Sequence, residues 1–300
     1  MKRKGTGPDG LVIVDKPAGL TSHDVVARMR RLAGTRKIGH AGTLDPMATG
    51  VLVIGVEKAT RLLGHLMLTD KTYRATIRLG RSTVTDDAEG EVTATTSTAA
   101  VTPEAIADGV AALTGDILQT PSKVSAIKID GKRSYALVRN GEEVHLKARP
   151  VTVSSFTVHA RRGAAAEDGT PLLDLDVTVE CSSGTYVRAL ARDLGAGLGV
   201  GGHLTALRRT RVGPYTLEQA VTLEQLEESF THLPIGTAAA AAFPRWDVDD
   251  EQARLMVHGV RLASPGDLGP GPVAVFDPAG RFLALVEEKY GQARLLAVFA

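Results

Sequence analysis

The order in which strand-like and helix-like segments follow one another constrains the fold of this chain most. Residues 72–79 alternate apolar and polar side chains, and residues 173–179 repeat this pattern, which is typical of a half-buried strand. Apolar residues at helical spacing, as in 25–32, occur among such strands without the regular strand–helix–strand repeat of a doubly wound parallel sheet. The sequence therefore predicts an α+β fold.

Turn and capping signals delimit the remaining elements. Further strands are expected at 11–14, 51–54, 124–129 and 204–212, and helices at 57–68, 103–113, 134–139 and 185–194. We expect Thr21 or Ser22 to cap the helix that ends at Gly34. Residues 236–242, a Gly-Thr pair followed by five Ala, are typical of a linker. Behind them, a helix near 251–258 and strands at 273–276, 282–286 and 294–299 predict a small β-rich appendage.

Length and cysteine content narrow the class of protein. A chain of 300 residues predicts two domains, or one large domain with an appendage. The single Cys excludes a disulfide framework and a Cys-rich zinc site, and it fits a reducing cytosol. The apolar run behind the basic start, residues 11–14, is too short for a secretory signal or a membrane span. We therefore expect a cytoplasmic protein.

The net charge of +1 hides an uneven distribution along the chain. Residues 1–215 carry 29 Lys+Arg and 22 Asp+Glu, whereas residues 216–300 carry 6 and 12, so the two parts balance at +7 and −6. Within the basic part, residues 1–40 carry +6 and residues 121–150 carry +4. Because a polyanion responds to local charge, a nucleic-acid surface is a fair hypothesis, although a single basic run is usually a solvated face.

The common nucleotide-binding, metal-binding and hydrolase motifs are either absent from this sequence or stand in an unsuitable structural context. Residues 197–202 match GxGxxG, but they follow an expected helix, whereas a dinucleotide-binding loop follows a strand and opens a helix. We interpret these glycines as a helix stop and a turn. No P-loop, HExxH or GxSxG occurs, and the eight His lack metal-ligand spacing.

The segment 39–50 is the strongest candidate for a chemical site. It holds three Gly and a Pro in twelve residues, which predicts a loop, and Asp45 stands directly before Pro46. The proline disfavours helical backbone at Asp45. A carboxylate on such a scaffold can serve as nucleophile or base. Taken by itself, the loop is more typical of an Asx-turn, in which the carboxylate only hydrogen-bonds nearby backbone.

The complete string GHAGTLDPMATGVL at 39–52 resembles the catalytic loop of the TruB-type tRNA pseudouridine synthases. Further segments match this family in order: DKPAGLTS at 15–22, DKTYR at 70–74, PSKVSA at 121–126, GKRSY at 131–135, CSSGTYVR at 181–188 and LRRT at 207–210. The resemblance spans roughly residues 10–221. Residues beyond it match the family's small C-terminal domain only loosely.

The resemblance implies an architecture. It predicts the pseudouridine-synthase fold, with a mixed, largely antiparallel central sheet flanked by helices and loops. Residues 1–245 would form the catalytic domain, with an RNA-gripping insertion at about 121–150, and residues 246–300 a small β-rich PUA-like domain. The implied enzyme is an isomerase that converts uridine 55 in the T-arm of tRNA to pseudouridine by flipping the base, breaking its glycosidic bond and rejoining it through carbon.

The resemblance also assigns the catalytic residues. Asp45 falls on the family's essential aspartate, which acts as nucleophile or as base. Arg188 falls on the arginine that pairs with that aspartate, and its guanidinium suits the task because it stays charged. Tyr73 falls on the tyrosine that stacks on the target base and is a candidate to move a proton late in the reaction.

Four further residues are expected to bind substrate. Tyr186 and Leu207 match positions that wall the pocket, and His40 matches the histidine that fills the space left by the flipped nucleotide. Lys16 resembles a structural and phosphate-side residue. No metal or cofactor is implied, and the expected protein is a monomer whose partner is tRNA and not a membrane.

Three alternatives remain open on sequence grounds. A guided or ribosomal pseudouridine synthase would be expected to carry long basic extensions, which this chain lacks. A non-catalytic tRNA-binding or folding factor would have no need of Asp45, Tyr73 and Arg188 together. A glycoside hydrolase would need a second carboxylate beside Asp45, and the loop holds none.

Overall fold

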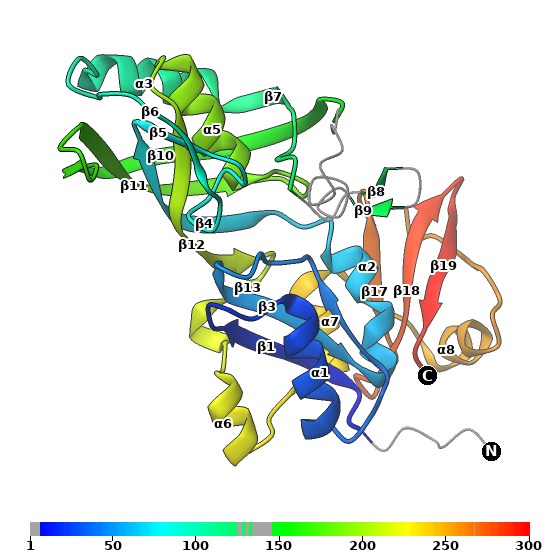
Figure 1. Cartoon of the computed structure of the whole chain (residues 1–300). Helices are drawn as coiled ribbons and strands as arrows, with labels where there is room; N and C mark the ends of the chain where they lie inside the picture. The colour runs from blue at the N-terminus through cyan, green and yellow to red at the C-terminus, as the bar shows by residue number, and fades with distance from the viewer. Residues whose placement is uncertain (1–6, 125–127, 130–131, 134–145, 267) are drawn as a thin grey trace. The chain divides into compact units, whose positions relative to one another are not determined.

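In the computed structural model the chain divides into two compact units, which are described separately. The structure describes residues 7–124, 128–129, 132–133, 146–266 and 268–300. The first unit comprises residues 1–46, 50–68 and 212–300, and the second comprises residues 47–49 and 69–211. Both contain antiparallel sheet and helices (Figure 1). The predicted α+β class is confirmed.

The first unit is built on a central strand pair. β1 (Gly10–Lys16) pairs antiparallel with β3 (Thr49–Val56) along its whole length, from Gly10 opposite Val56 to Lys16 opposite Gly50. β2 (Ile38–Ala41) pairs with β3, and β14 (Leu233–Pro234) pairs with β1. The other elements around this pair are α1 (Ser22–Leu32), η1 (Glu57–Arg61), α2 (Leu63–Leu66), β13 (Tyr215–Thr216), η2 (Leu217–Gln219) and α6 (Leu223–Glu228). The predicted helix at 57–68 is thus two short turns.

Local sequence accounts for α1. Thr21 accepts from the Asp24 amide and Asp24 accepts from the Thr21 amide, a capping box that satisfies two backbone donors at the helix start. Val25, Val26 and Met29 then face the core, and Arg30 and Arg31 follow in the last turn, where cations complement the helix dipole. Of the two cap candidates, Thr21 is therefore the cap.

The C-terminal residues form a five-stranded sheet within the first unit. Its order is β15-β17-β18-β19-β16, and α8 contacts β18 and β16. The bounds are β15 (Arg245–Asp247), α8 (Asp250–Val257), β16 (Leu262–Ala263), β17 (Pro272–Phe276), β18 (Phe282–Lys289) and β19 (Gln292–Val298). The helix and three strands expected here are confirmed.

The linker expected at 236–242 is wrong, because these residues form the helix α7 (Ile235–Ala242). Ala238 and Ala239 are fully buried in a core shared with β1, β3 and the C-terminal sheet. Tyr215 donates its hydroxyl to the Ala238 carbonyl at 2.9 Å. Alanine has the highest helix propensity, and its small side chain lets a helix approach its neighbours closely. These two properties explain why the Ala run forms a buried helix.

The second unit holds the larger share of antiparallel strand. Its order is β12-β4-β11-β10-β7, and α3 and α5 contact each other beside these strands (Figure 1). The bounds are β4 (Lys71–Leu79), β5 (Arg81–Thr83), β6 (Val92–Thr95), α3 (Pro103–Ala112), β7 (Gly115–Gln119), β8 (Lys128–Ile129), β9 (Lys132–Arg133), β10 (Arg149–Ala165), β11 (Pro171–Cys181), α5 (Val187–Gly197) and β12 (Gly202–Val212).

In this unit, two predicted elements lie largely outside the described residues, and one long strand was not predicted. The strand at 124–129 and the helix at 134–139 lie largely outside the described residues, as does much of the insertion at about 121–150. The 17-residue strand β10 was not anticipated. Its residues are mostly exposed, and two bulges shift its register with β11, so it lacks the alternation that marks a half-buried strand.

The GxGxxG match behaves as a turn. α5 ends at Gly197, and Gly199 and Gly201 have φ values of +72° and +76°. A helix precedes these glycines, so they do not present a helix N-terminus to a phosphate.

Candidate active site

The loop that carries Asp45 runs from Gly42 to Ala48, between β2 and β3. Gly42 and Gly50 have φ values of +82° and +99°, a left-handed backbone that disfavours any side chain. These glycines turn the chain into and out of the loop. Asp45 itself is half-buried.

Both neighbours of Asp45 are held by hydrogen bonds from residues 16–22. The Ser22 hydroxyl donates to the Leu44 carbonyl at 3.1 Å and accepts from the Leu44 amide at 2.9 Å. The Gly19 amide donates to the Pro46 carbonyl at 2.9 Å. The main chain on either side of Asp45 is therefore fixed to one short segment.

Lys16 forms the centre of this arrangement. Its ammonium donates to the carbonyls of Pro17 at 2.9 Å, Leu20 at 2.7 Å and Pro46 at 3.3 Å. The residue is fully buried, and hydrogen bonds from a charged donor are stronger than neutral ones. Of the two roles expected for Lys16, these contacts favour a structural role over contact with phosphate.

His40 lies in β2, opposite Ile54 of β3, and is half-buried. Its ring makes an edge-to-face contact with the exposed His23 of α1, with centroids 5.5 Å apart and planes at 79°. His40 is the next-to-last residue of β2, which leads directly into the loop that carries Asp45. The structure therefore brings Lys16, His40 and Asp45 into one region of the first unit.

Arg188 occupies the first turn of α5 in the second unit. Its Nη1 donates to the Thr85 carbonyl at 2.8 Å and lies 3.2 Å from Asp87 Oδ2, while Nη2 donates to the Val124 carbonyl at 3.0 Å. The side chains of Arg188 and Asp87 are at most 5 % exposed. A buried guanidinium is tolerated when its charge is balanced, and the Asp87 carboxylate supplies the opposite charge here.

Asp87 is a residue that the sequence analysis missed. The turn that carries it includes Asp86 in left-handed backbone, with φ +60°, and Arg192 donates to the Asp86 carboxylate at 3.2 Å. Asp87 itself accepts from the Glu89 amide at 3.1 Å. The paired Asp86-Asp87 between two expected elements was the available signal, but nothing in the sequence indicated that Arg188 would be its partner.

The remaining predicted residues also lie in the second unit. Tyr73 is 7 % exposed and stands on β4 opposite Val179 of β11. Leu207 is equally buried on β12, the neighbouring strand of the same sheet. Tyr186 is half-buried and is the N-cap residue of α5, two residues before Arg188. Tyr186 and Arg188 thus share one helix start.

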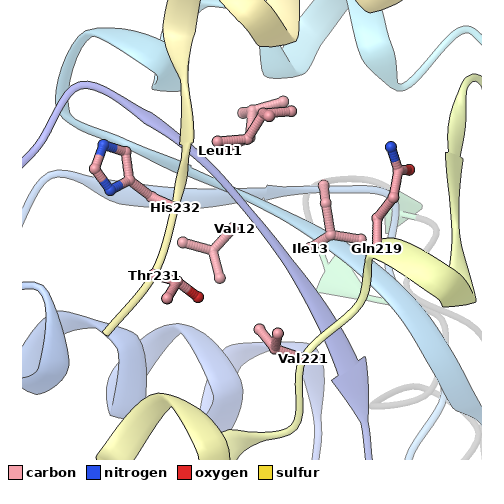
Figure 2. Close-up of a pocket in the computed structure, with 8 residues that line it drawn as sticks. Leu11, Val12, Ile13, Gln219, Val221, Thr231 and His232 are labelled. Atoms are coloured by element: carbon pink, nitrogen blue, oxygen red, sulfur yellow. The ribbon is translucent and has the colours of Figure 1, made fainter. Parts of the chain in front are cut away.

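A cavity among the described residues of the first unit lies away from these side chains. Its volume is about 220 Å³. Figure 2 shows this cavity along β1, lined mainly by apolar side chains from Leu11–Ile13 and from segments near Val221 and Leu233. It includes none of the predicted site residues.

The described residues offer neither a metal-binding cluster nor a membrane-spanning helix. No group of three or more His, Cys, Asp or Glu side chains in the described part of the chain is arranged to hold a metal ion. No helix among the described residues is both long and apolar enough to span a membrane.

Three family models match the chain. Residues 30–187 match the TruB family pseudouridylate synthase N-terminal domain, and residues 188–234 match the tRNA pseudouridylate synthase B C-terminal domain. Residues 243–300 match the C-terminal domain of tRNA pseudouridine synthase II.

Curated relatives are similar over the full length. The tRNA pseudouridine synthase B of Streptomyces griseus is 68% identical over 300 residues, and that of Streptomyces avermitilis is 69% identical, each covering 100% of both chains. The protein of that name from Thermobifida fusca is 60% identical over 292 residues, covering 97% of this chain and 99% of its own.

Solved structures resemble the chain at lower identity. One is a Cbf5-Nop10-Gar1 complex, with a TM-score of 0.71 and 28% identity over 97% of this chain and 84% of the matched chain. Another is an H/ACA RNP bound to a substrate RNA containing 2′-deoxyuridine, with a TM-score of 0.68 and 26% identity over 97% and 85%.

Proposed function

The chain belongs to the TruB family of pseudouridylate synthases, and we propose that Asp45 is the essential carboxylate of its reaction. The protein is a tRNA pseudouridine synthase, which isomerises uridine 55 of the T-arm to pseudouridine. The bond from C1′ to nitrogen breaks, the base turns over, and a bond from C1′ to carbon forms. The reaction needs no redox change, and it relies on positioning and on proton transfer from carbon to nitrogen.

One observation carries the assignment of Asp45. The residues on both sides of it are hydrogen-bonded to the segment 16–22, whereas Asp45 itself is only half-buried. A carboxylate on a fixed main chain keeps its orientation when a nucleotide arrives. An Asx-turn alone would not account for the three residues that hold this loop.

Tyr73 and Arg188 complete the proposed catalytic set. The Arg188 guanidinium is the proposed cation of the site, and its contacts with Asp87 and two carbonyls hold it in one orientation. Tyr73 supplies an aromatic face for the target base, because stacking tolerates rotation of a base in its own plane.

The other assigned residues shape the binding region. Tyr186 and Leu207 wall the pocket, and His40 fills the place of the flipped nucleotide, which offsets part of the cost of unstacking. Lys16 acts through the loop and not on the RNA, since its ammonium lies on main-chain carbonyls.

The proposal extends to organisation and setting. We place a small C-terminal domain at 246–300 and an RNA-gripping insertion at about 121–150, and we expect a monomer that works in the cytoplasm on free tRNA. Light scattering of the purified protein tests the monomer, and a dimeric mass contradicts it.

The central experiment compares wild type with Asp45→Asn. Unmodified tRNA is incubated with each protein, and pseudouridine is mapped by carbodiimide treatment and primer extension. We expect modification at the T-arm uridine alone with wild type and none with Asp45→Asn, while tRNA binding persists. The substitution removes the carboxylate and keeps its shape.

Asp108→Asn is the matched control, since this exposed residue of α3 undergoes the same change of charge outside the loop. An active Asp45→Asn would favour a non-catalytic role for the loop. Modification at other sites would favour a synthase with a different target.

A further inference from the structure

Gln119, the last residue of β7, devotes both polar groups of its side chain to one distant peptide. Its Nε2 donates to the Tyr186 carbonyl at 3.1 Å, and its Oε1 accepts from the Tyr186 amide at 2.8 Å. Gln119 is 2 % exposed. The amide therefore pairs with Tyr186 as the backbone of a neighbouring strand would.

This pairing occurs where α5 begins. Tyr186 is the N-cap residue, with an extended backbone of φ −102° and ψ 106°, and no side-chain hydrogen bond caps the helix there. The main chain that places Tyr186 and Arg188 is thus held by Gln119, from outside the helix. A shift of this peptide would move both side chains together.

Gln119 is itself held on both sides. Its backbone lies opposite Arg149 in the pairing of β7 with β10. The carbonyl of the next residue, Thr120, accepts from Arg192 Nη2 at 2.7 Å. Because a flipped amide would face donor to donor and acceptor to acceptor, only one orientation of the side chain makes both bonds to Tyr186.

We propose that Gln119 is a positioning residue of the isomerisation, which holds the Tyr186 peptide and thereby places the Tyr186 ring and the Arg188 guanidinium. The inference rests on the proposed function, because the roles of those two side chains belong to it. Gln119 is 2 % exposed and its side-chain amide pairs with the Tyr186 peptide, so its removal should lower kcat more than it weakens tRNA affinity.

The first test is Gln119→Met, which keeps the length of the side chain and removes both hydrogen bonds. Since a displacement of about 1 Å costs on the order of 100-fold in rate, we expect kcat to fall about 10- to 100-fold. We expect KM and the Kd for tRNA to change much less than kcat, since the variant displaces the Tyr186 ring and does not remove it.

The second test is Gln119→Glu, which makes the effect depend on pH. A neutral carboxylic acid has one donor and one acceptor and reproduces the amide pairing, whereas the carboxylate has no donor and faces the Tyr186 carbonyl. Burial favours the neutral form of such a group. We therefore expect kcat relative to wild type to rise several-fold from about pH 8 to about pH 6.

Tyr215→Phe is the matched control for a lost buried hydrogen bond, because it removes the bond to Ala238 in the first unit. It should lower Tm and leave kcat unchanged. If Gln119→Met lowers Tm with kcat unchanged, or if Gln119→Glu shows no pH dependence relative to wild type, the positioning role is overturned. If Gln119→Met does not fold, the pH series of Gln119→Glu decides.

Variants of Tyr186 and Arg188 distinguish a failure of the proposed function from a failure of the role inferred for Gln119. If Tyr186→Ala and Arg188→Lys retain full kcat, the proposed function is wrong at those residues. If they lose activity and both Gln119 variants keep it, only the present inference is wrong.

Discussion

Arg188 shows how the identity of one side chain follows from its surroundings. Its guanidinium reaches the Thr85 and Val124 carbonyls and the Asp87 carboxylate at the same time. A lysine ammonium carries equal charge, but its three donors leave one nitrogen, whereas Arg188 reaches these oxygens from two separate nitrogens held in one plane. These contacts explain why an arginine, and not a lysine, suits this position.

The first residue-scale prediction is that Arg188→Lys lowers kcat about 100-fold or more, because the site loses an oriented cation. Asp87→Asn should also lower kcat, since it removes the charge that balances Arg188. Both variants should bind tRNA within about threefold of wild type. Single-turnover kinetics and filter binding measure the two quantities.

Arg162→Lys is the control, because Arg162 pairs with Asp176 on an exposed strand. If Arg188→Lys behaves like Arg162→Lys, the guanidinium has no special role.

The second residue-scale prediction concerns Lys71, which is buried two residues before Tyr73. Burial, reinforced by the charge of Arg209, lowers the pKa of Lys71 from 10.5 to about 8. Between these values the unfolded chain binds a proton that the folded chain has released, so the free energy of unfolding rises with pH. The gain is at most about 3 kcal/mol.

Urea denaturation of wild type and Lys71→Met across this pH window measures the effect. Wild type should gain stability relative to Lys71→Met as the pH rises from about 8 to about 10. Parallel stability curves for the two proteins would contradict the shift.

At the scale of elements, strong local patterns predicted structure well and weak ones did not. α1 had apolar residues at helical spacing and a capping box, and β4 had strict alternation, so both were found from the sequence. α7 was mistaken for a linker because a run of Ala shows no amphipathic period, and β10 was missed because it is mostly exposed. Tertiary packing decides such segments.

The element-scale prediction tests the connection between β1 and the Asp45 loop. Lys16→Met leaves the carbonyls of Pro17, Leu20 and Pro46 without their charged donor, which should cost about 2 kcal/mol in stability. The loop should also loosen, so we expect kcat to fall at least about tenfold.

Lys58→Met is the matched control, because Lys58 donates to the Phe299 carbonyl at 2.8 Å away from the loop. It should cost stability without a loss of kcat. Equal kcat in the two variants would show that Lys16 contributes to stability alone.

At the scale of the whole molecule, the charge distribution takes on a structural meaning. The acidic residues beyond 215 belong to a segment whose α7, β17 and β18 share a hydrophobic core with β1 and β3. Packing explains the place of this segment in the first unit without any contact to RNA. The basic residues before it remain the candidates for the tRNA surface.

The whole-molecule prediction is a strong salt dependence of tRNA affinity. Each phosphate neutralised by a basic residue releases counterions, so Kd should rise at least about tenfold between about 50 and 200 mM salt. Equilibrium binding at several salt concentrations measures the slope. A Kd that does not change with salt would contradict a basic RNA-binding face.

Arg30 and Arg31 provide a matched test, because both are exposed in the last turn of α1. If they contact phosphate, Arg30→Gln with Arg31→Gln should reduce the slope of log Kd against log salt by about one to two.

The sequence by itself determined the class of fold, most of the helices and strands, and the string around Asp45 from which the family was identified. These depend on residues near one another in the chain. Only the tertiary structure decided which remote groups meet: Lys16 with Pro46 across 30 residues, Gln119 with Tyr186 across 67, and Arg188 with Thr85 across 103. Which of these distant residues come into contact depends on how the hydrophobic cores pack. Short sequence patterns do not specify that packing.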